Sequence, residues 1–515
     1  MTETKVSTPN WGETIKAWLH PSVITMLFLG FSAGIPLLLI FSTLSAWLTE
    51  AGIEKSAVTF FSWAALGYSF KFIWAPLIDR IPLPYLTGKL GRRRGWMVVS
   101  QIFVMGSIFL MAAIDPTISH SHLIAMAWAA VLLGFSSATQ DIVIDAYRIE
   151  CAAEELQALL SATYIAGYRI GMIVAGAGSL ALAEKLGSSA QIYSYSAWRI
   201  TYLAIGFCML TGLVTTLVIP EPKRADTDKL AYSALEYLRF FLLFLGAAGI
   251  FVMVFFYSSA LAEMVQQGLQ NHFPLFSQVA GFLVEALRLF LALICAFMVT
   301  RILVTIGLVS QAMLDDTYVD PIKDFFKRYG YKAAWLLLLL IGFYRVSDIV
   351  LGVISTVFYI DLGFSKMEIA AVVKTFGLLM TIAGGFLGGM LTVRYGVLKI
   401  LFLGAALSAA TNVLFMMLAT VGPDPLLLKV VIATDNLAAG LASAAFVAFL
   451  SSLTSISFTA VQYAVFSSLM LLFPKLIGGY SGTIVTGIGY PNFFLLTTLM
   501  GIPVLLLIWL VRNVK

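Results

Sequence analysis

Fourteen stretches of this sequence are long and apolar enough to cross a lipid bilayer as helices. A spanning helix needs about 20 mostly apolar residues, because the hydrocarbon core is about 30 Å thick. The stretches are residues 22–48, 56–80, 96–114, 122–146, 158–184, 199–219, 235–262, 276–308, 332–359, 366–392, 397–421, 426–453, 457–480 and 490–512. They lack the ten-residue alternation of a membrane β-barrel, so the sequence predicts an all-α integral membrane protein with fourteen transmembrane helices.

Composition agrees with a surface that faces lipid. Of the 515 residues, 60% are hydrophobic and 11% are charged, whereas about a quarter of the residues of a soluble protein are charged. The three cysteines, Cys151, Cys208 and Cys295, have no metal-type spacing and are too few for a disulfide framework. We therefore expect no metal and no other cofactor. The net charge of +5 does not require nucleic acid as a partner, because membrane topology explains where the basic residues lie.

Lysine and arginine are concentrated in loops of one parity. The loop after the second stretch holds Arg80, Lys89, Arg92, Arg93 and Arg94, and the loops after the sixth, eighth and tenth stretches are basic too. Loops of the other parity are nearly free of them, with none in 115–121 or 263–275. Positively charged loops remain in the cytoplasm, so we expect both termini there. Residues 1–21 are then a cytoplasmic segment, either a short interfacial helix or an irregular tail.

The chain contains an internal repeat. WLTEAGIEK at 47–55 resembles FYIDLGFSK at 358–366, about 311 residues later, and each segment closes the first stretch of a pair. This predicts two six-helix halves, residues 22–222 and 319–515, joined by a linker, 223–318, that carries two additional transmembrane helices. Two such halves in parallel repeat are the architecture of major facilitator transporters, whose substrate site lies at the midplane between the halves.

The basic loop after the second stretch is a candidate gate. It places an Asp-Arg pair at one helix end and several arginines before the next helix, so a carboxylate can pair with guanidiniums and cap helix termini. The predicted members of this cytoplasmic gate are Asp79, Arg80, Arg92, Arg93, Asp145 and Arg148. In the alternative interpretation the arginines only set the topology, and Asp145 pairs with Arg148 at the membrane interface.

Several polar residues fall inside the apolar stretches. Each ionisable one costs about 2.5–3.5 kcal/mol on insertion, so a set of them indicates a cavity with a function. The candidates for substrate binding are Lys71, Gln140, Tyr168, Arg169, Arg345, Lys374, Asn436 and Gln462. Arg169 and Arg345 lie near the middle of their stretches. Each cation either contacts the substrate or belongs to a structural ion pair.

Asp141 is the first candidate for proton coupling, followed by Asp348 and Asp435. Burial among apolar residues disfavours its charged form, unless a cation such as Lys71 or Arg169 holds it ionised. Protonation would then release the cation for a substrate carboxylate. The alternative is a structural pair between Asp141 and one of these cations.

A membrane-embedded transferase is the main competing class. It would need a nucleophile, metal ligands or a His/Asp pair at membrane depth, and the four histidines all lie outside the long apolar stretches. The sequence also lacks GxxxxGK[ST], so we expect no nucleotide hydrolysis. The pattern therefore favours a secondary transporter, either ion-coupled or facilitative.

Several segments resemble the AmpG muropeptide permeases of Gram-negative bacteria. They include GYSFKFIWAPLIDR at 67–80, SATQDIVIDAY at 137–147, GYRIGMIVAG at 167–176, VVKTFGLLMTIAGG at 372–385 and DNLAAGLASAAFVAFL at 435–450. The resemblance covers residues 22–222 and 319–512, whereas the inserted pair at 230–310 carries little of it. Acetyl-CoA transporters of eukaryotic membranes are similar in parts of the same core and are the alternative.

The resemblance implies import of GlcNAc-anhydro-MurNAc and its peptides across the inner membrane, driven by protons. Arg169 and Arg345 would then hold substrate carboxylates bidentately, and Lys71 and Lys374 would act as point charges. The polar residues of the family carry over most directly onto Gln140 and Asp141. Phosphoryl or nucleotide ligands would use the same cations, so charge alone does not separate the two substrate classes.

Overall fold

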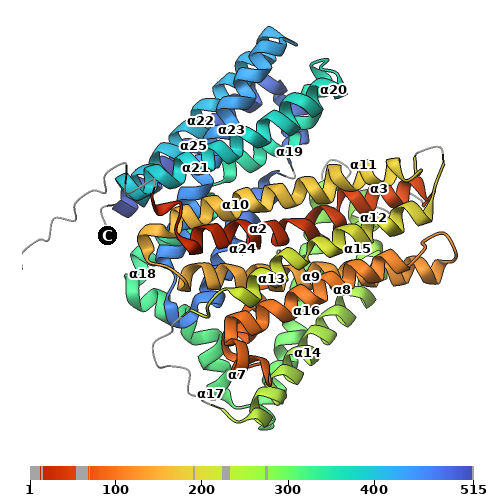
Figure 1. Ribbon diagram of the computed structural model, residues 1–515, viewed down its shortest axis with the longest axis vertical. Coiled ribbons are helices and arrows are strands. Elements are labelled where there is room, and N and C mark those ends of the chain that lie inside the picture. The colour runs from red at the N-terminus through yellow and green to blue at the C-terminus, as the bar shows by residue number, and fades with distance from the viewer. Residues whose placement is uncertain are drawn as a thin grey trace, which may run out of the picture. The chain divides into compact units, whose positions relative to one another are not determined.

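The computed structural model describes residues 12, 16–53, 68, 70–189, 192–222, 232–272, 277–478 and 480–512, and every regular element in them is a helix (Figure 1). Thirteen helical segments of these residues are long and apolar enough to span a membrane. The remaining predicted span, 56–80, lies largely outside the described residues, as does most of the segment 1–21. The prediction of an all-α membrane protein is confirmed.

The first half of the chain holds the helices of the first five described spans and their connections. They are α2 (Pro21–Ile40), α3 (Ser42–Glu50), η2 (Lys71–Ile73), α6 (Ala75–Arg80), α7 (Leu86–Leu90), α8 (Arg92–Ala113), α9 (His120–Glu150), η3 (Glu154–Leu156), α10 (Gln157–Ile173), η4 (Val174–Gly178), α11 (Ser179–Lys185), α12 (Tyr195–Cys208) and α13 (Leu210–Val218). Several of these are consecutive pieces of one span, so α10, η4 and α11 follow each other without a break in the chain.

The second half repeats this pattern. Its elements are α18 (Asp320–Phe343), α19 (Val346–Asp361), α20 (Lys366–Glu368), η7 (Ile369–Phe376), α21 (Gly377–Tyr395), α22 (Val397–Val421), α23 (Pro425–Leu453), η8 (Ile456–Phe458), α24 (Thr459–Gly478) and α25 (Ser481–Arg512). Two of them contain a turn at a glycine with positive φ, Gly330 in α18 and Gly489 in α25, so each is two helices in sequence.

Residues 224–324 form a compact unit of their own, apart from 1–223 and 325–515. This unit contains α14 (Ala234–Tyr257), α15 (Ser259–His272), α16 (Ser277–Thr305), α17 (Gln311–Leu314) and η6 (Asp315–Val319). The sequence predicted a span to residue 262 and a loop over 263–275, and this was wrong. The chain instead starts a second helix, α15, at Ser259, because its polar residues alternate with Leu261, Met264 and Val265 at helical spacing.

The repeat predicted from residues 47–55 and 358–366 is visible in the geometry. Both α3 and α19 end in the same glycine turn, with φ of 73° at Gly52 and 97° at Gly363. In both, the residue after the glycine donates its N–H to a carbonyl five residues back, at 3.0 Å for Ile53 and 3.1 Å for Phe364. This is the Schellman geometry, which only glycine adopts readily. The two segments are therefore equivalent in structure as well as in sequence.

Glycines set the closest helix contacts in each half. In the first half α2 lies along α10 (Figure 1), and a Cβ added at Gly30 or Gly167 would lie 2.2 or 2.0 Å from a carbonyl oxygen of the other helix. In the second half Gly384 and Gly440 serve the same purpose between α21 and α23, with 2.1 Å at each. Small residues allow such backbone contact inside a membrane. Each of these helix pairs is therefore closely packed.

The loops of the two halves define two ends of this bundle. We call the end that carries residues 81–91, 151–156 and 454–458 the basic end. The turns at 51–53 and 362–365 lie at the opposite end of their helices, which we call the far end. The predicted gate residues lie toward the basic end.

Candidate functional site

Asp79 joins the two halves at the basic end. It stands at the end of α6 with 3% of its surface exposed. Its Oδ1 accepts a hydrogen bond from Arg93 Nη2 at 2.7 Å, and its Oδ2 accepts one from the backbone N–H of Val461 at 3.0 Å. Val461 is the third residue of α24, so the carboxylate of the first half caps a helix of the second half. The helix capping and guanidinium pairing predicted for this loop are both present.

Arg93 is the buried centre of this contact. Its Nε and Nη2 donate to the two oxygens of Glu150 at 3.0 and 2.6 Å, in addition to the bond with Asp79. Arg92 donates to the backbone oxygen of Asp79, and the Arg80 guanidinium lies 5.6 Å from the ring centre of Phe458 in the second half. Charge-assisted bonds with this geometry are among the strongest in proteins. The second carboxylate, Glu150, was not foreseen because its partner is 57 residues away in the sequence.

Glu221 completes the basic end of the first half. Its carboxylate accepts the backbone N–H groups of Arg93 and Arg94 at 2.8 and 3.0 Å and so caps the start of α8. Burial raises the pKa of Glu221, against the lowering effect of these two bonds. Gly91 has φ of 89° and leaves no room for a side chain, since a Cβ would lie 2.3 Å from Glu221 Cδ. The sequence offered no signal for this cap beyond an acid after the sixth span.

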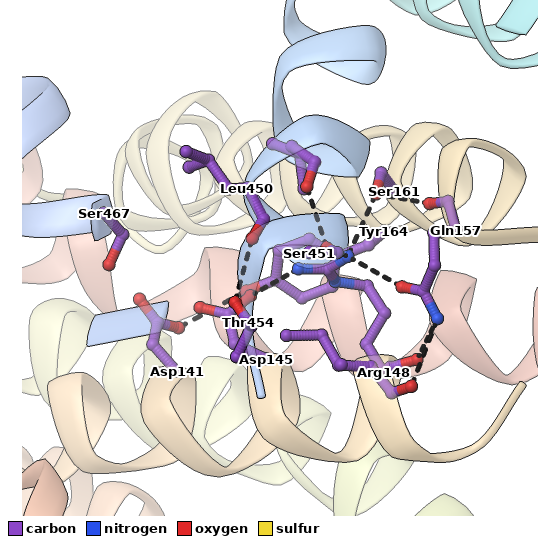
Figure 2. A network of polar contacts seen from close by, with 12 residues as sticks. Asp141, Asp145, Arg148, Gln157, Ser161, Tyr164, Leu450, Ser451, Thr454 and Ser467 are labelled. Atoms are coloured by element: carbon purple, nitrogen blue, oxygen red, sulfur yellow. Dashed lines mark hydrogen bonds and ion pairs between the residues drawn. The ribbon is translucent and has the colours of Figure 1, made fainter. Parts of the chain in front are cut away.

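Arg148 forms a second polar link between the halves. Its side chain is fully buried, and Nη1 donates to Ser451 Oγ of the second half at 2.9 Å and to Ser161 Oγ of the first half at 3.1 Å (Figure 2). The guanidinium also lies 5.1 Å from the ring centre of Tyr463, another residue of the second half. Its Nη2 contacts Asp145 Oδ1 at 3.4 Å, which is the predicted pairing.

Asp145 connects this link to the membrane interior. Its second oxygen, Oδ2, lies 3.6 Å from Lys71 Nζ, so the carboxylate stands between Lys71 and Arg148. We call the series Lys71, Asp145, Arg148 and Ser451 the relay. Lys71 and Asp145 are each less than a tenth exposed, so the pair is screened little by solvent. The relay runs from a cation of the second span to the other half of the molecule.

Asp141 lies one helical turn before Asp145 and has a different partner. Its Oδ1 accepts a bond from the Tyr164 hydroxyl of α10 at 3.4 Å, and it forms no ion pair among the described residues (Figure 2). The structural pairs considered for Asp141, with Lys71 or Arg169, are therefore absent from this part of the chain. Lys71 bonds instead with the neighbouring acid. Asp141 and Asp145 nevertheless share one face of α9, because they are four residues apart.

Two predicted substrate residues, Gln462 and Gln140, form hydrogen bonds with other groups of the protein. Gln462 stands near the start of α24 at the basic end, where its Oε1 accepts from the backbone N–H of Ser455 at 2.7 Å and from Arg328 Nη2 at 2.9 Å. It caps a helix there. Gln140 is fully buried and donates to Ser32 Oγ of α2 at 3.0 Å, so it faces the interior of the first half.

The second half holds its own polar group within the membrane. The Asp435 carboxylate accepts a bond from Thr411 Oγ1 at 3.2 Å, and Asn436 Oδ1 accepts one from Thr381 Oγ1 at 2.8 Å. Asp348 is half-buried and close enough to Asp435 for their charges to interact. Two candidate acids thus gather in the second half, as Asp141 and Asp145 do in the first.

The remaining candidates come from both halves. Tyr168 and Arg169 are half-buried on α10, and Arg345 is half-buried at the start of α19. Arg169 and Arg345 interact electrostatically although they belong to different halves. Lys374, on η7, is exposed. Arg169 and Arg345 are therefore near enough for their charges to interact across the halves.

Comparisons with known proteins agree with this architecture. The family model of the Major Facilitator Superfamily matches residues 22–316. The anhydromuropeptide permease of Escherichia coli K12 is 28% identical over 500 residues, which are 97% of this chain and 81% of that protein. A Rickettsia conorii protein named transporter AmpG 4 is 29% identical over 94% of each chain. The resemblance to AmpG permeases is thereby confirmed.

Two solved structures share the fold. The proton:xylose symporter XylE is 12% identical with a TM-score of 0.56, covering 97% of this chain and 96% of that chain. The fucose:proton symporter FucP of Escherichia coli is 11% identical with a TM-score of 0.59, covering 97% and 99%. At these identities the likeness concerns the arrangement of helices alone.

Proposed function

Since the chain belongs to the major facilitator superfamily, we propose that it is a proton-coupled secondary transporter that imports GlcNAc-anhydro-MurNAc and its peptides across the bacterial inner membrane. The observation that carries the substrate assignment is the similarity to an anhydromuropeptide permease over 97% of this chain. The proposed orientation puts both termini and the basic end in the cytoplasm, because the basic loops lie there.

The membrane cations suit such a substrate. Muropeptides carry peptide carboxylates, and a guanidinium binds a carboxylate with two parallel hydrogen bonds. Arg169 and Arg345 belong to opposite halves, and their positive charges repel each other. A carboxylate bound between them removes that repulsion. The substrate would thus be held by both halves at once, as alternating access requires.

The gate follows from the contacts at the basic end. Asp79 with Val461, and Arg148 with Ser451, hold the two halves together there. In the proposed orientation these bonds close the cytoplasmic side. Release of substrate into the cytoplasm requires both bonds to break, because α24 and α23 must separate from α6 and α9. Asp79, Arg80, Arg92, Arg93, Asp145 and Arg148 are therefore proposed as gate residues.

The relay offers a physical route for coupling. Asp141 and Asp145 are one turn apart, and Lys71 lies beside the second of them. A proton taken up by this pair of acids weakens their hold on Lys71, because one negative charge is lost. Lys71 then becomes available to a substrate carboxylate. The relative strength of the interactions of Asp145 with Lys71 and with Arg148 changes at the same time. Proton and substrate in this way act on the same link between the halves.

One uptake experiment tests the proposal. The purified protein is reconstituted in vesicles, and uptake of radiolabelled anhydro-muropeptide is compared with uptake of acetyl-CoA, with and without an inward proton gradient. We expect accumulation of the muropeptide that depends on the gradient. Uptake of acetyl-CoA without uptake of the muropeptide would contradict the substrate assignment, and equal muropeptide accumulation without a gradient would contradict proton coupling.

A further inference from the structure

We propose that residues 16–20, which precede α2, form a strap that holds the two halves together in the state closed at the basic end. The ring of Trp18, in the first half, packs on the ring of Phe386 in the second half, with 4.7 Å between the ring centres and 59° between the ring planes. The inference rests on the proposed alternating access of the two halves. It does not depend on which substrate is transported.

The strap is a turn that is fixed to the start of α2. Within it the N–H of Leu19 donates to the carbonyl of Lys16 at 3.0 Å. His20 then caps α2, because its Nδ1 accepts the N–H of Ser22 at 3.3 Å. Since α2 packs on α10 through the glycine contacts described above, the backbone of the strap belongs firmly to the first half.

The partner ring lies beside a close approach of the two halves. Phe386 is three residues before Gly389 on α21, so the two positions are neighbours on that helix. A Cβ added at Gly389 would lie 3.2 Å from Ala162 Cβ and 3.3 Å from the carbonyl oxygen of Ala158, both on α10. If α10 and α21 separate, Phe386 must therefore also leave Trp18, because Trp18 is held by α2 and α2 follows α10.

The burial of the Trp18 ring distinguishes the strap from a membrane anchor. Tryptophans that anchor a protein lie at headgroup level and face lipid. Trp18 and Phe386 are both half-buried, whereas the neighbouring Leu19 is 74% exposed. An anchor would contribute equally to both states of the transporter, but a contact between the halves contributes only to the state in which they meet.

The expected effect of the strap is moderate. A contact that is present in only one of two states changes the ratio of those states by its own free energy. Loss of one aromatic pair should change the ratio about fivefold, which corresponds to about 1 kcal/mol. The charged bonds of the gate remain when the strap is lost, so the basic end should open more often but still close.

The test measures opening of the basic end through the reactivity of one thiol. Ala162→Cys is introduced in a background without the native cysteines. Ala162 is 2% exposed, so a water-soluble maleimide reaches the thiol only when α10 and α21 separate. We expect Trp18→Ala to raise the labelling rate of the detergent-purified full chain about fivefold, and Trp18→Phe, which keeps a ring, to raise it about twofold or less. Trp18 precedes the first spanning helix, so folding is expected to be retained.

Further variants assign the effect to this pair of rings. Phe386→Ala should raise the rate as Trp18→Ala does, and the double variant should raise it no further, because both changes remove the same contact. Trp128→Ala, the matched control, removes a tryptophan of α9 that is 66% exposed and should leave the rate unaltered.

Three results would overturn the strap: an unchanged rate in Trp18→Ala, independent effects that multiply in the double variant, or an equal rise in Trp128→Ala. Absence of labelling in the parent and in every variant would overturn both the strap and the proposed gate. Failure of muropeptide uptake, in contrast, would overturn only the substrate assignment, since the labelling needs no substrate.

Discussion

The two ends of the bundle use acidic residues in different ways. At the basic end, Asp79 of the first half accepts the N–H of Val461 in the second half. At the far end, Glu50 accepts bonds from Ser188 Oγ at 2.7 Å and Trp198 Nε1 at 2.8 Å, both in its own half. Among the described residues, the polar bonds between halves thus lie toward the basic end.

The repeat shows that this difference is systematic. Asp361 of the second half is the counterpart of Glu50, and it accepts the Tyr490 hydroxyl at 2.6 Å, again within its own half. Bonds within a half are kept when the halves rock against each other, whereas bonds between them must break in every cycle. Acids at the far end should therefore affect mainly stability, and acids at the basic end mainly transport.

The largest effect is expected for Arg148→Gln. Its guanidinium bonds both Ser161 and Ser451, and its loss leaves Asp145 with Lys71 alone. Breaking a buried charge pair costs about 3–5 kcal/mol. We expect uptake per folded molecule to fall at least about a hundredfold, which corresponds to about 2.7 kcal/mol. This fall is measured as uptake into vesicles, normalised to the amount of folded protein. Normal uptake would show that transport does not depend on the relay between Lys71 and Ser451.

The next effect is expected for Asp141→Asn, which mimics the protonated acid. It should abolish gradient-driven accumulation, because the residue no longer exchanges a proton, yet it should retain counterflow of substrate, which needs no net proton movement. Both assays use the same vesicles. Asp435→Asn is the matched variant in the second half. Equal loss of accumulation and counterflow would assign Asp141 to structure or direct binding, and retained pH-dependent uptake would transfer the coupling role to Asp348 or Asp435.

A smaller effect is expected for Asp79→Asn. The amide keeps an acceptor for one neighbour but loses the charge that Arg93 and the α24 terminus bind. One charge-assisted bond contributes about 1.5–3 kcal/mol, so uptake should fall about tenfold or more. Membrane expression should change much less. Unchanged uptake at a normal protein level would mean that this loop serves only the topology.

The smallest effect on transport is expected for Glu50→Gln. The change weakens two bonds at the far end and should lower the free energy of unfolding by about 1–3 kcal/mol. Uptake per folded molecule should remain within about twofold, because neither bond crosses between the halves. A thermal unfolding series together with the uptake assay separates the two quantities. A tenfold loss of uptake without a loss of stability would contradict the inference that acids at the far end affect mainly stability.

Much of the architecture could be predicted because it is encoded locally. The spans follow from runs of apolar residues, and the repeat from a nine-residue match that ends in a glycine turn. The polar contacts around Asp79 were accessible for the same reason, since the Asp-Arg and Arg-Arg pairs lie at adjacent helix ends.

Contacts between distant segments could not be predicted in this way. Ser451 lies 303 residues from Arg148, and Val461 lies 382 residues from Asp79 and contributes only its backbone. Gln462 was placed in the substrate site because it falls inside an apolar stretch, yet it lies at the end of its helix. The depth of a residue in the membrane, counted along the sequence, is uncertain by about one helical turn. One turn is enough to separate a residue that caps a helix from one that faces a cavity.

The central claim is that the halves separate at the basic end in every transport cycle. A cysteine pair tests it directly, with Ala162→Cys on α10 and Gly389→Cys on α21 in a background without Cys151, Cys208 and Cys295. A Cβ at Gly389 would lie 3.2 Å from Ala162 Cβ, close to the separation of about 3.5–4.5 Å in a disulfide. We predict that oxidation stops muropeptide uptake and that reduction restores it. If the fully cross-linked protein takes up muropeptide as fast as the protein with free thiols, the account is contradicted.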